Sequence, residues 1–107
     1  MFLARVTGNV VATQKDKSLN GHKLLVVEPL NVKYDAATGK PASLGNTGRA
    51  IVAIDVVGAG EGQLVLIVQG SSARMTDVTK NLPADAVVVG IVDSAEYDGK
   101  TFFKTEE

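Results

Sequence analysis

Residues 55–74 read DVVGAGEGQLVLIVQGSSAR and place three glycines between two apolar runs. At first sight Gly58, Gly60 and Gly62 look like a nucleotide-binding loop. Such a loop needs a helix directly after its glycines, because the phosphate binds free N–H groups at the helix N-terminus. Here residues 64–68 follow, which are strand-forming, and the final glycine of GxGxxG is missing. The stretch therefore predicts a strand, a tight glycine hairpin and a second strand, with no bound cofactor.

The length and composition of the chain limit the classes of protein to which it can belong. Its 107 residues suit one domain, and its apolar residues are mostly Val, Ala, Leu and Ile, which favours β-sheet over a helical bundle. The net charge of −1 gives no general attraction to nucleic acid or anionic membranes. Without cysteine there are no disulfides and no thiolate chemistry. Because a signal-peptide pattern and a membrane-length apolar run are both missing, we expect a soluble intracellular protein.

Five segments predict the strands of a mainly β fold, a small closed or partly open barrel of the OB-like, Greek-key type. Gly8 in the first segment indicates a bend or bulge. Pro29 is predicted to end the second, since proline has no N–H for a central ladder. The long polar connection after it suggests a surface or interface role. The segments are residues 2–13, 23–27, 49–57, 63–69 and 86–92, and the connection is 31–48.

Two smaller elements complete the predicted architecture. Residues 71–78 favour a short helix that begins at a serine N-cap and ends near Leu82-Pro83. Asp98-Gly99 is typical of a two-residue turn, and it predicts a C-terminal hairpin of residues 95–97 and 101–103. We therefore divide the chain into a barrel domain, residues 1–94, and a C-terminal hairpin and tail, residues 95–107.

The central predicted strands are apolar on both faces. Residues 50–57, AIVAIDVV, and 64–68, LVLIV, show no polar alternation. One face of such a strand can be buried inside the barrel, but the other also needs a cover. Because the chain offers little helix for that purpose, the pattern predicts an oligomer.

The segment Gly70-Ser71-Ser72-Ala73-Arg74 resembles the serine turn of acyl-transfer enzymes, but it lacks the G-x-S-x-G pattern. The lone histidine, His22, lies in a distant polar turn, so neither serine has an evident activating base. We predict no catalytic residue and no metal site, and interpret the serines as a helix cap. A small-anion site that includes Arg74 is an alternative.

A nucleic-acid-binding barrel is the other alternative, since the strand number and chain length fit that class. Such a module needs a basic groove and exposed aromatic side chains. The chain has three Phe, two Tyr and no evident basic groove, so we expect no nucleic acid partner.

Four ordered motifs resemble one known family. ARVTGNVVATQKDKSLNGHKLLVVEPL at 4–30, DVVGAGEG at 55–62, VLIVQGSSAR at 65–74 and PADAVVVGIVD at 83–93 are similar to the EutN/CcmL vertex proteins of bacterial microcompartment shells. Together the motifs cover roughly residues 2–94. The family commonly has an acidic residue directly after the GAGxG glycines, where this chain has Gln63.

This resemblance implies a homopentamer that caps the vertices of a cytoplasmic microcompartment shell. Its neighbours would be hexameric or pseudohexameric shell proteins, with no nucleic acid, membrane or cofactor involved. A heterologous contact that closes at five gives the tile that bends a sheet of six-fold tiles into a closed shell. The candidate interface residues are Asp55, Gly58, Gly60, Gly62, Gln63, Gly70, Ser71, Ser72 and Arg74.

Overall fold

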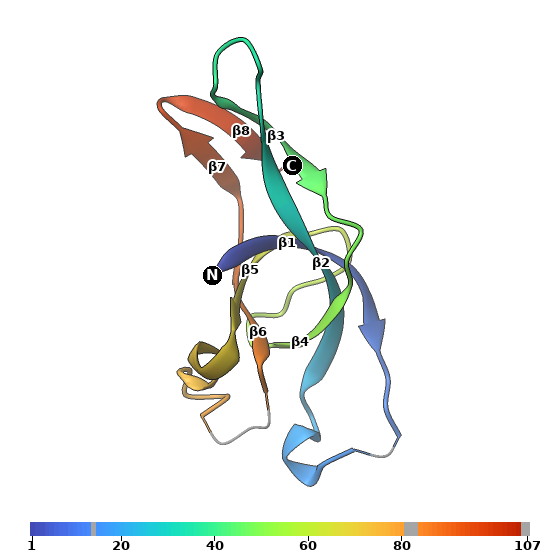
Figure 1. The fold of residues 1–107 in the computed structure, drawn as a ribbon. Coiled ribbons are helices and arrows are strands. Elements are labelled where there is room, and N and C mark those ends of the chain that lie inside the picture. The colour runs from blue at the N-terminus through green and yellow to red at the C-terminus, as the bar shows by residue number, and fades with distance from the viewer. Residues whose placement is uncertain (14, 81–83, 106–107) are drawn as a thin grey trace.

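The computed structural model describes residues 1–13, 15–80 and 84–105, and its regular structure is dominated by strands (Figure 1). The described residues contain no α-helix, so the predicted short helix is instead a 3-10 turn that begins one residue earlier. The strands are β1 Phe2–Val10, β2 Lys23–Tyr34, β3 Pro41–Asn46, β4 Ile51–Asp55, β5 Leu64–Gln69, β6 Ala86–Ile91, β7 Ser94–Tyr97 and β8 Lys100–Lys104, and the 3-10 helices are η1 Lys17–Leu19 and η2 Gly70–Arg74.

Five strands close a barrel in the order β1–β5–β6–β4–β2, and β2 pairs back with β1. Only β4 and β6 run parallel; the other neighbours in the barrel are antiparallel. Closure removes the exposed strand edges that an open sheet of this size would present. The register of β1 against β2 shifts between Val6 and Gly8, which confirms the predicted bulge. The expected five-stranded, OB-like barrel is therefore correct.

The predicted glycine hairpin is wrong. β4 pairs with β2 and β6, whereas β5 pairs with β1 and β6, so the two strands flanking the glycines are not neighbours. Residues 56–63 instead form a connection between them (Figure 1). Strand propensity predicted both strands correctly, but local sequence does not determine whether consecutive strands pair.

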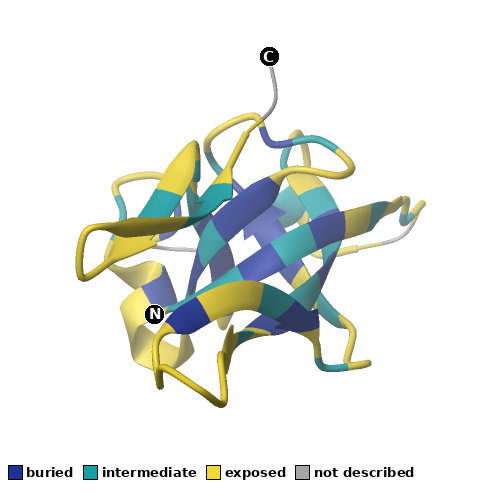
Figure 2. Ribbon diagram, turned by 90° about the horizontal axis from the view of Figure 1, so that it is seen from above, coloured by how far each residue is buried: buried dark blue, intermediate teal, exposed yellow. Residues whose placement is uncertain are grey.

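Small apolar side chains fill the barrel. Figure 2 shows buried positions along the barrel strands. Valine and alanine predominate because a five-stranded barrel leaves little interior space. Ala59, from the connection between β4 and β5, belongs to the same cluster, so this loop contributes to the core as well as linking strands. The buried cluster comprises Ala4, Val6, Leu25, Val27, Ala53, Ala59, Val65, Ile67, Ala86 and Val88.

A second apolar cluster involves the other face of the central strands. Ile54 of β4 and Val87 of β6 pack there with Ala73 of η2 and Ala84, and Leu19 of η1 lies against them. The chain therefore covers part of the outer face that we expected a partner to cover. Val52 nevertheless keeps 50% of its surface exposed. Both faces of the central strands are apolar and need a cover, as predicted, but the 3-10 turns of the same chain cover part of the outer face.

β2 does not end at Pro29, as the sequence predicted. Pro29 lies opposite Ala4, after the last residue that pairs with β4, Val27, and before the first that pairs with β3, Leu30. Its missing N–H thus falls where one partner strand is replaced by another, which is a tolerated position for proline.

Residues 31–48 are likewise mostly strand rather than the predicted polar connection. They contain the end of β2 and the whole of β3, which pair from Leu30–Asn46 to Tyr34–Pro41. Polar residues such as Asn31 and Lys33 are exposed on this extension. Residues 31–48 lack the apolar alternation of a half-buried strand, so their sequence does not predict the strands that the structure shows.

The C-terminal hairpin is confirmed, with β7 paired to β8 around Asp98 and Gly99. Both turn residues have positive φ, 52° and 79°, as a type I′ turn requires. Figure 1 shows the hairpin beside β3, and Lys40 forms an ion pair of 3.1 Å with Asp98. β3, the end of β2 and the hairpin form an arm that projects from the barrel and helps extend the molecule to 52 Å.

Candidate functional site

The connection between β4 and β5 is organised by the carboxylate of Asp55. This side chain accepts hydrogen bonds from the backbone N–H groups of Val57 at 3.0 Å, Gly58 at 3.2 Å and Ala59 at 2.8 Å. Only 8% of Asp55 is exposed, so its charge depends on these donors for compensation. Asp55 therefore acts inside its own chain as the cap of the turn.

Two glycines in this connection have left-handed backbone conformations. Gly58 has φ +81° and Gly62 has φ +85°, values that a side chain disfavours. Gly60 lies outside that region, and a Cβ there would meet only the Gln63 Oε1 at 4.0 Å. The predicted interface glycines thus differ in their backbone requirement.

The Gln63 side chain also closes the loop from within. Its Oε1 accepts a hydrogen bond of 2.8 Å from the Gly60 N–H, while backbone bonds join Gly62 and Gln63 to Val6 of β1. A carboxylate could accept the bond from Gly60 equally well, so glutamine retains this function of an acid without its charge. Both Gln63 and Gly62 remain exposed.

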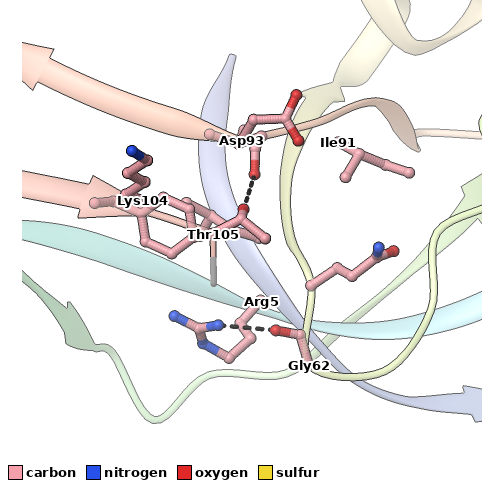
Figure 3. Close-up of a pocket in the computed structure, with 10 residues that line it drawn as sticks. Arg5, Gly62, Ile91, Asp93, Lys104 and Thr105 are labelled. Carbon is pink, nitrogen blue, oxygen red and sulfur yellow. Dashed lines mark hydrogen bonds between the residues drawn. The ribbon is translucent and has the colours of Figure 1, made fainter. Parts of the chain in front are cut away.

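A cavity of about 410 Å³ lies between this loop and the start of the arm (Figure 3). Arg5 of β1 lies on one side and donates a hydrogen bond of 2.9 Å to the Gly62 carbonyl. Asp93 and Lys104 lie on the other side, where the Thr105 N–H binds the Asp93 carbonyl at 2.8 Å. The lining residues are Arg5, Gly62, Gln63, Leu64, Ile91, Val92, Asp93, Phe103, Lys104 and Thr105.

The second group of predicted site residues forms η2. Gly70 has φ +66°, and its N–H donates to the Asp85 carbonyl at 2.8 Å. The helix has no side-chain cap and its N-cap residue is Gln69, so the prediction that a serine caps it is wrong. Because η2 already begins at Gly70, the serines fall inside the turn, where both are exposed.

Arg74 is fixed at the end of this turn by a hydrogen bond of 3.1 Å from its Nη1 to the Ala84 carbonyl. Its side chain is otherwise exposed, and Met75 beside it is 83% exposed. Thr79 supports the turn from inside, since its hydroxyl donates to the Ala73 carbonyl at 2.6 Å.

The predicted site residues therefore form two groups, one before β5 and one after it. The group before β5 comprises Asp55, Gly58, Gly60, Gly62 and Gln63, of which Gly62 and Gln63 line the cavity. The group after β5 comprises Gly70, Ser71, Ser72 and Arg74, which belong to η2. Arg5, Asp93, Phe103 and Lys104 also line the cavity, but the sequence did not predict them as site residues. No spacing signal identifies them, because they meet only when the hairpin folds beside the barrel.

Little in the described structure indicates reactive chemistry. No group of three potential metal ligands occurs within residues 1–13, 15–80 and 84–105. In the same residues each buried side-chain polar atom has a hydrogen-bond partner. His22 lies in the turn between η1 and β2, an element different from that of Ser71 and Ser72. Among the described residues, no helix is long and apolar enough to cross a membrane.

Comparison with known proteins gives consistent matches along the chain. A family model described as Ethanolamine utilisation protein EutN/carboxysome matches residues 1–93. The bacterial microcompartment shell vertex protein PduN of Salmonella typhimurium is 50% identical over 94 residues, which cover 88% of this chain and 97% of that protein. The carboxysome shell vertex protein CcmL of Synechocystis is 45% identical over 94 residues, covering 88% and 84%.

A solved structure has the same fold. The GrpN pentameric microcompartment shell protein from Rhodospirillum rubrum superimposes with a TM-score of 0.73 at 43% identity. The match covers 91% of this chain and 99% of that one. The similarity therefore extends over most of the chain.

Proposed function

Because this chain belongs to the EutN/CcmL family of shell vertex proteins, we propose that five copies close a ring at each corner of a polyhedral protein shell. It is a structural protein of a bacterial microcompartment or carboxysome shell rather than an enzyme. The observation that carries the proposal is the near full-length match to a pentameric shell protein in both sequence and fold.

The surface of the single chain supports assembly. Val52 of β4 and Ile91 of β6 are apolar side chains that keep 50% and 37% of their surface exposed. Burial of apolar area contributes about 25 cal/mol per Å². A ring contact that covers such side chains would use the outer strand faces that η1 and η2 leave open.

The symmetry of the ring explains its place in a shell. Five copies related by rotation must use two different patches on each copy, so that every contact joins one patch to the other. A five-fold ring inserted among six-fold tiles introduces the curvature that a flat layer lacks. We propose that hexameric or pseudohexameric shell proteins surround it, with the barrel providing a rigid tile.

The ring can be tested by native mass spectrometry or light scattering. Five copies of the 11.2 kDa chain give about 56 kDa, and we expect this mass at micromolar concentration. A stable monomer under these conditions would contradict the ring.

Placement at the corners needs a separate experiment. The protein would be co-expressed with a hexameric shell protein, and closed particles imaged by electron cryomicroscopy. Density for the five-stranded barrel is expected only at five-fold axes. Its presence at six-fold positions, or its exclusion from closed particles, would contradict a vertex function.

A further inference from the structure

Within the part of the chain that the structure describes, most surface charges are not paired with an opposite charge. The sequence contains 11 basic and 12 acidic residues, yet within residues 1–13, 15–80 and 84–105 only Lys40 and Asp98 form an ion pair. Some other charged side chains, such as Lys23 and the buried Asp55, hydrogen-bond the backbone of their own chain, but exposed charged groups remain that can contact other molecules. Two groups of them lie at the opposite ends of β5, one in the cavity and one around η2.

The cavity combines charge with an apolar wall. Arg5 and Lys104 contribute two positive charges and Asp93 one negative charge, with Ile91 and Phe103 beside them. The Arg5 guanidinium donates one hydrogen bond to the Gly62 carbonyl, which holds it at the rim while its other N–H groups are available. Ile91 keeps 37% of its surface exposed.

The η2 end carries a complementary set of groups. Arg74 contributes a positive charge whose position is fixed by the Ala84 carbonyl, and Asp77 and Asp85 contribute exposed negative charges. Met75 projects from the same turn with 83% of its surface exposed. A side chain held in position before binding loses less entropy when it forms a contact.

We propose that η2 of one copy docks into the cavity of the next copy around the ring, with Arg74 facing Asp93 and Met75 against Ile91. Asp77 and Asp85 would then face the side that carries Arg5 and Lys104. This inference rests on the proposed ring and assigns its two patches.

The positions of the two patches suit a contact that closes a ring. They are separated by the six residues of β5, about 20 Å at the rise of a β-strand. One copy can therefore use both patches at once, as every member of a closed ring must. The occupant of the cavity is then a second copy of this chain.

Cysteine cross-linking gives the first test, because the chain contains no cysteine. The full chain carrying Met75→Cys and Ile91→Cys together is oxidised and separated on a denaturing gel. We expect covalent oligomers up to five copies, whereas either substitution alone should give no product larger than a dimer. Met75→Cys with Val11→Cys, another exposed position, is the matched control and should give no ladder to five.

Charge reversal gives the second test, read by native mass spectrometry at one fixed concentration. Arg74→Glu and Asp93→Arg should each reduce the pentamer at least tenfold, and the double variant should recover most of it. Lys17→Glu makes the same charge change as Arg74→Glu on η1 and should leave the pentamer unchanged. Circular dichroism checks that each variant is folded; if a single variant unfolds, the cross-linking result decides.

The outcomes separate this inference from the ring itself. If the wild-type chain is not a pentamer, the proposed function fails. If the wild type is a pentamer but the cysteine pair gives no ladder, the docking of η2 into the cavity is wrong. If folded single charge variants remain pentameric, or the double variant shows no recovery, the pairing of Arg74 with Asp93 is wrong.

Discussion

Asp55 is one of only two buried polar or charged residues in the described structure, and its carboxylate satisfies three backbone donors. Asp55→Ala removes all three acceptors, and each hydrogen bond to a charged group contributes about 1.5–3 kcal/mol. Allowing for some water entry, we expect Asp55→Ala to lower the free energy of unfolding by about 3 kcal/mol, and Asp55→Asn by less.

Urea unfolding would measure this change, with the protein concentration held constant because assembly adds to apparent stability. Glu96→Ala, at an exposed acidic residue of β7 outside this turn and outside both proposed contact patches, is the control and should change stability by less than about 0.5 kcal/mol. Equal effects of the two substitutions would show that Asp55 does not organise the loop.

The glycines of the same loop give a matched series. Gly58 and Gly62 have φ near +80°, so Gly58→Ala or Gly62→Ala should each cost about 1 kcal/mol or more. Gly60 has an ordinary φ and space for a methyl group, so Gly60→Ala should be close to neutral. Thermal unfolding of the three variants at one concentration is sufficient, and an equal loss at Gly60 would contradict this assignment.

At the scale of elements, propensity predicted where most strands lie but not how they pair. Residues 63–69 and 86–92 are close to β5 and β6 because β-branched residues fit a buried pleated surface. The partner of β5 depends on the closed topology, which joins it to β1 and β6 instead of β4. β3 was not predicted because an exposed extension does not need apolar alternation.

The candidate site was predictable only in part, for a related reason. The glycine loop and η2 are continuous in sequence, so motifs reveal them. The cavity, by contrast, includes Arg5 from the first strand and Lys104 from the last. Residues brought together by the position of a hairpin leave no local pattern, and no repeat or spacing connects them.

The proposed boundary between barrel and hairpin leads to a truncation experiment. Neither apolar cluster contains a residue after Val89, so a chain that ends at residue 94 should keep the barrel folded. It loses the Thr105 hydrogen bonds to Asp93 and Val92, which we expect to cost about 1 kcal/mol. It also loses Phe103 and Lys104 from the cavity, so the ring should weaken.

Circular dichroism with heating would follow the barrel, and native mass spectrometry the ring. A loss of stability near 1 kcal/mol lowers the melting temperature by roughly 4–8 °C in a domain of this size. An unfolded truncated chain would show that the hairpin belongs to the folding unit of the barrel.

At the scale of the whole molecule, a barrel with a covered core carries its contact groups outside that core. Both apolar clusters are closed within one chain, while Met75, Ile91 and most charges face outward. The subunit can therefore fold before it assembles, and damage to one contact patch need not unfold it. This separation makes assembly testable with folded variants.

A five-membered ring predicts a particular effect of mixing. In a head-to-tail ring each copy uses two different patches, so a copy with only one damaged patch can still join a neighbour through the other. Arg74→Glu subunits keep an intact cavity, so they should bind one neighbour and then prevent the next subunit from joining, instead of staying outside the oligomers. With isotopically labelled wild type and subunit exchange, native mass spectrometry should show pentamers decreasing and open oligomers of mixed composition increasing as the variant fraction rises. If wild-type pentamers persist at full yield beside separate variant monomers, the variant has lost both contacts, and η2 cannot be an independent half of the interface.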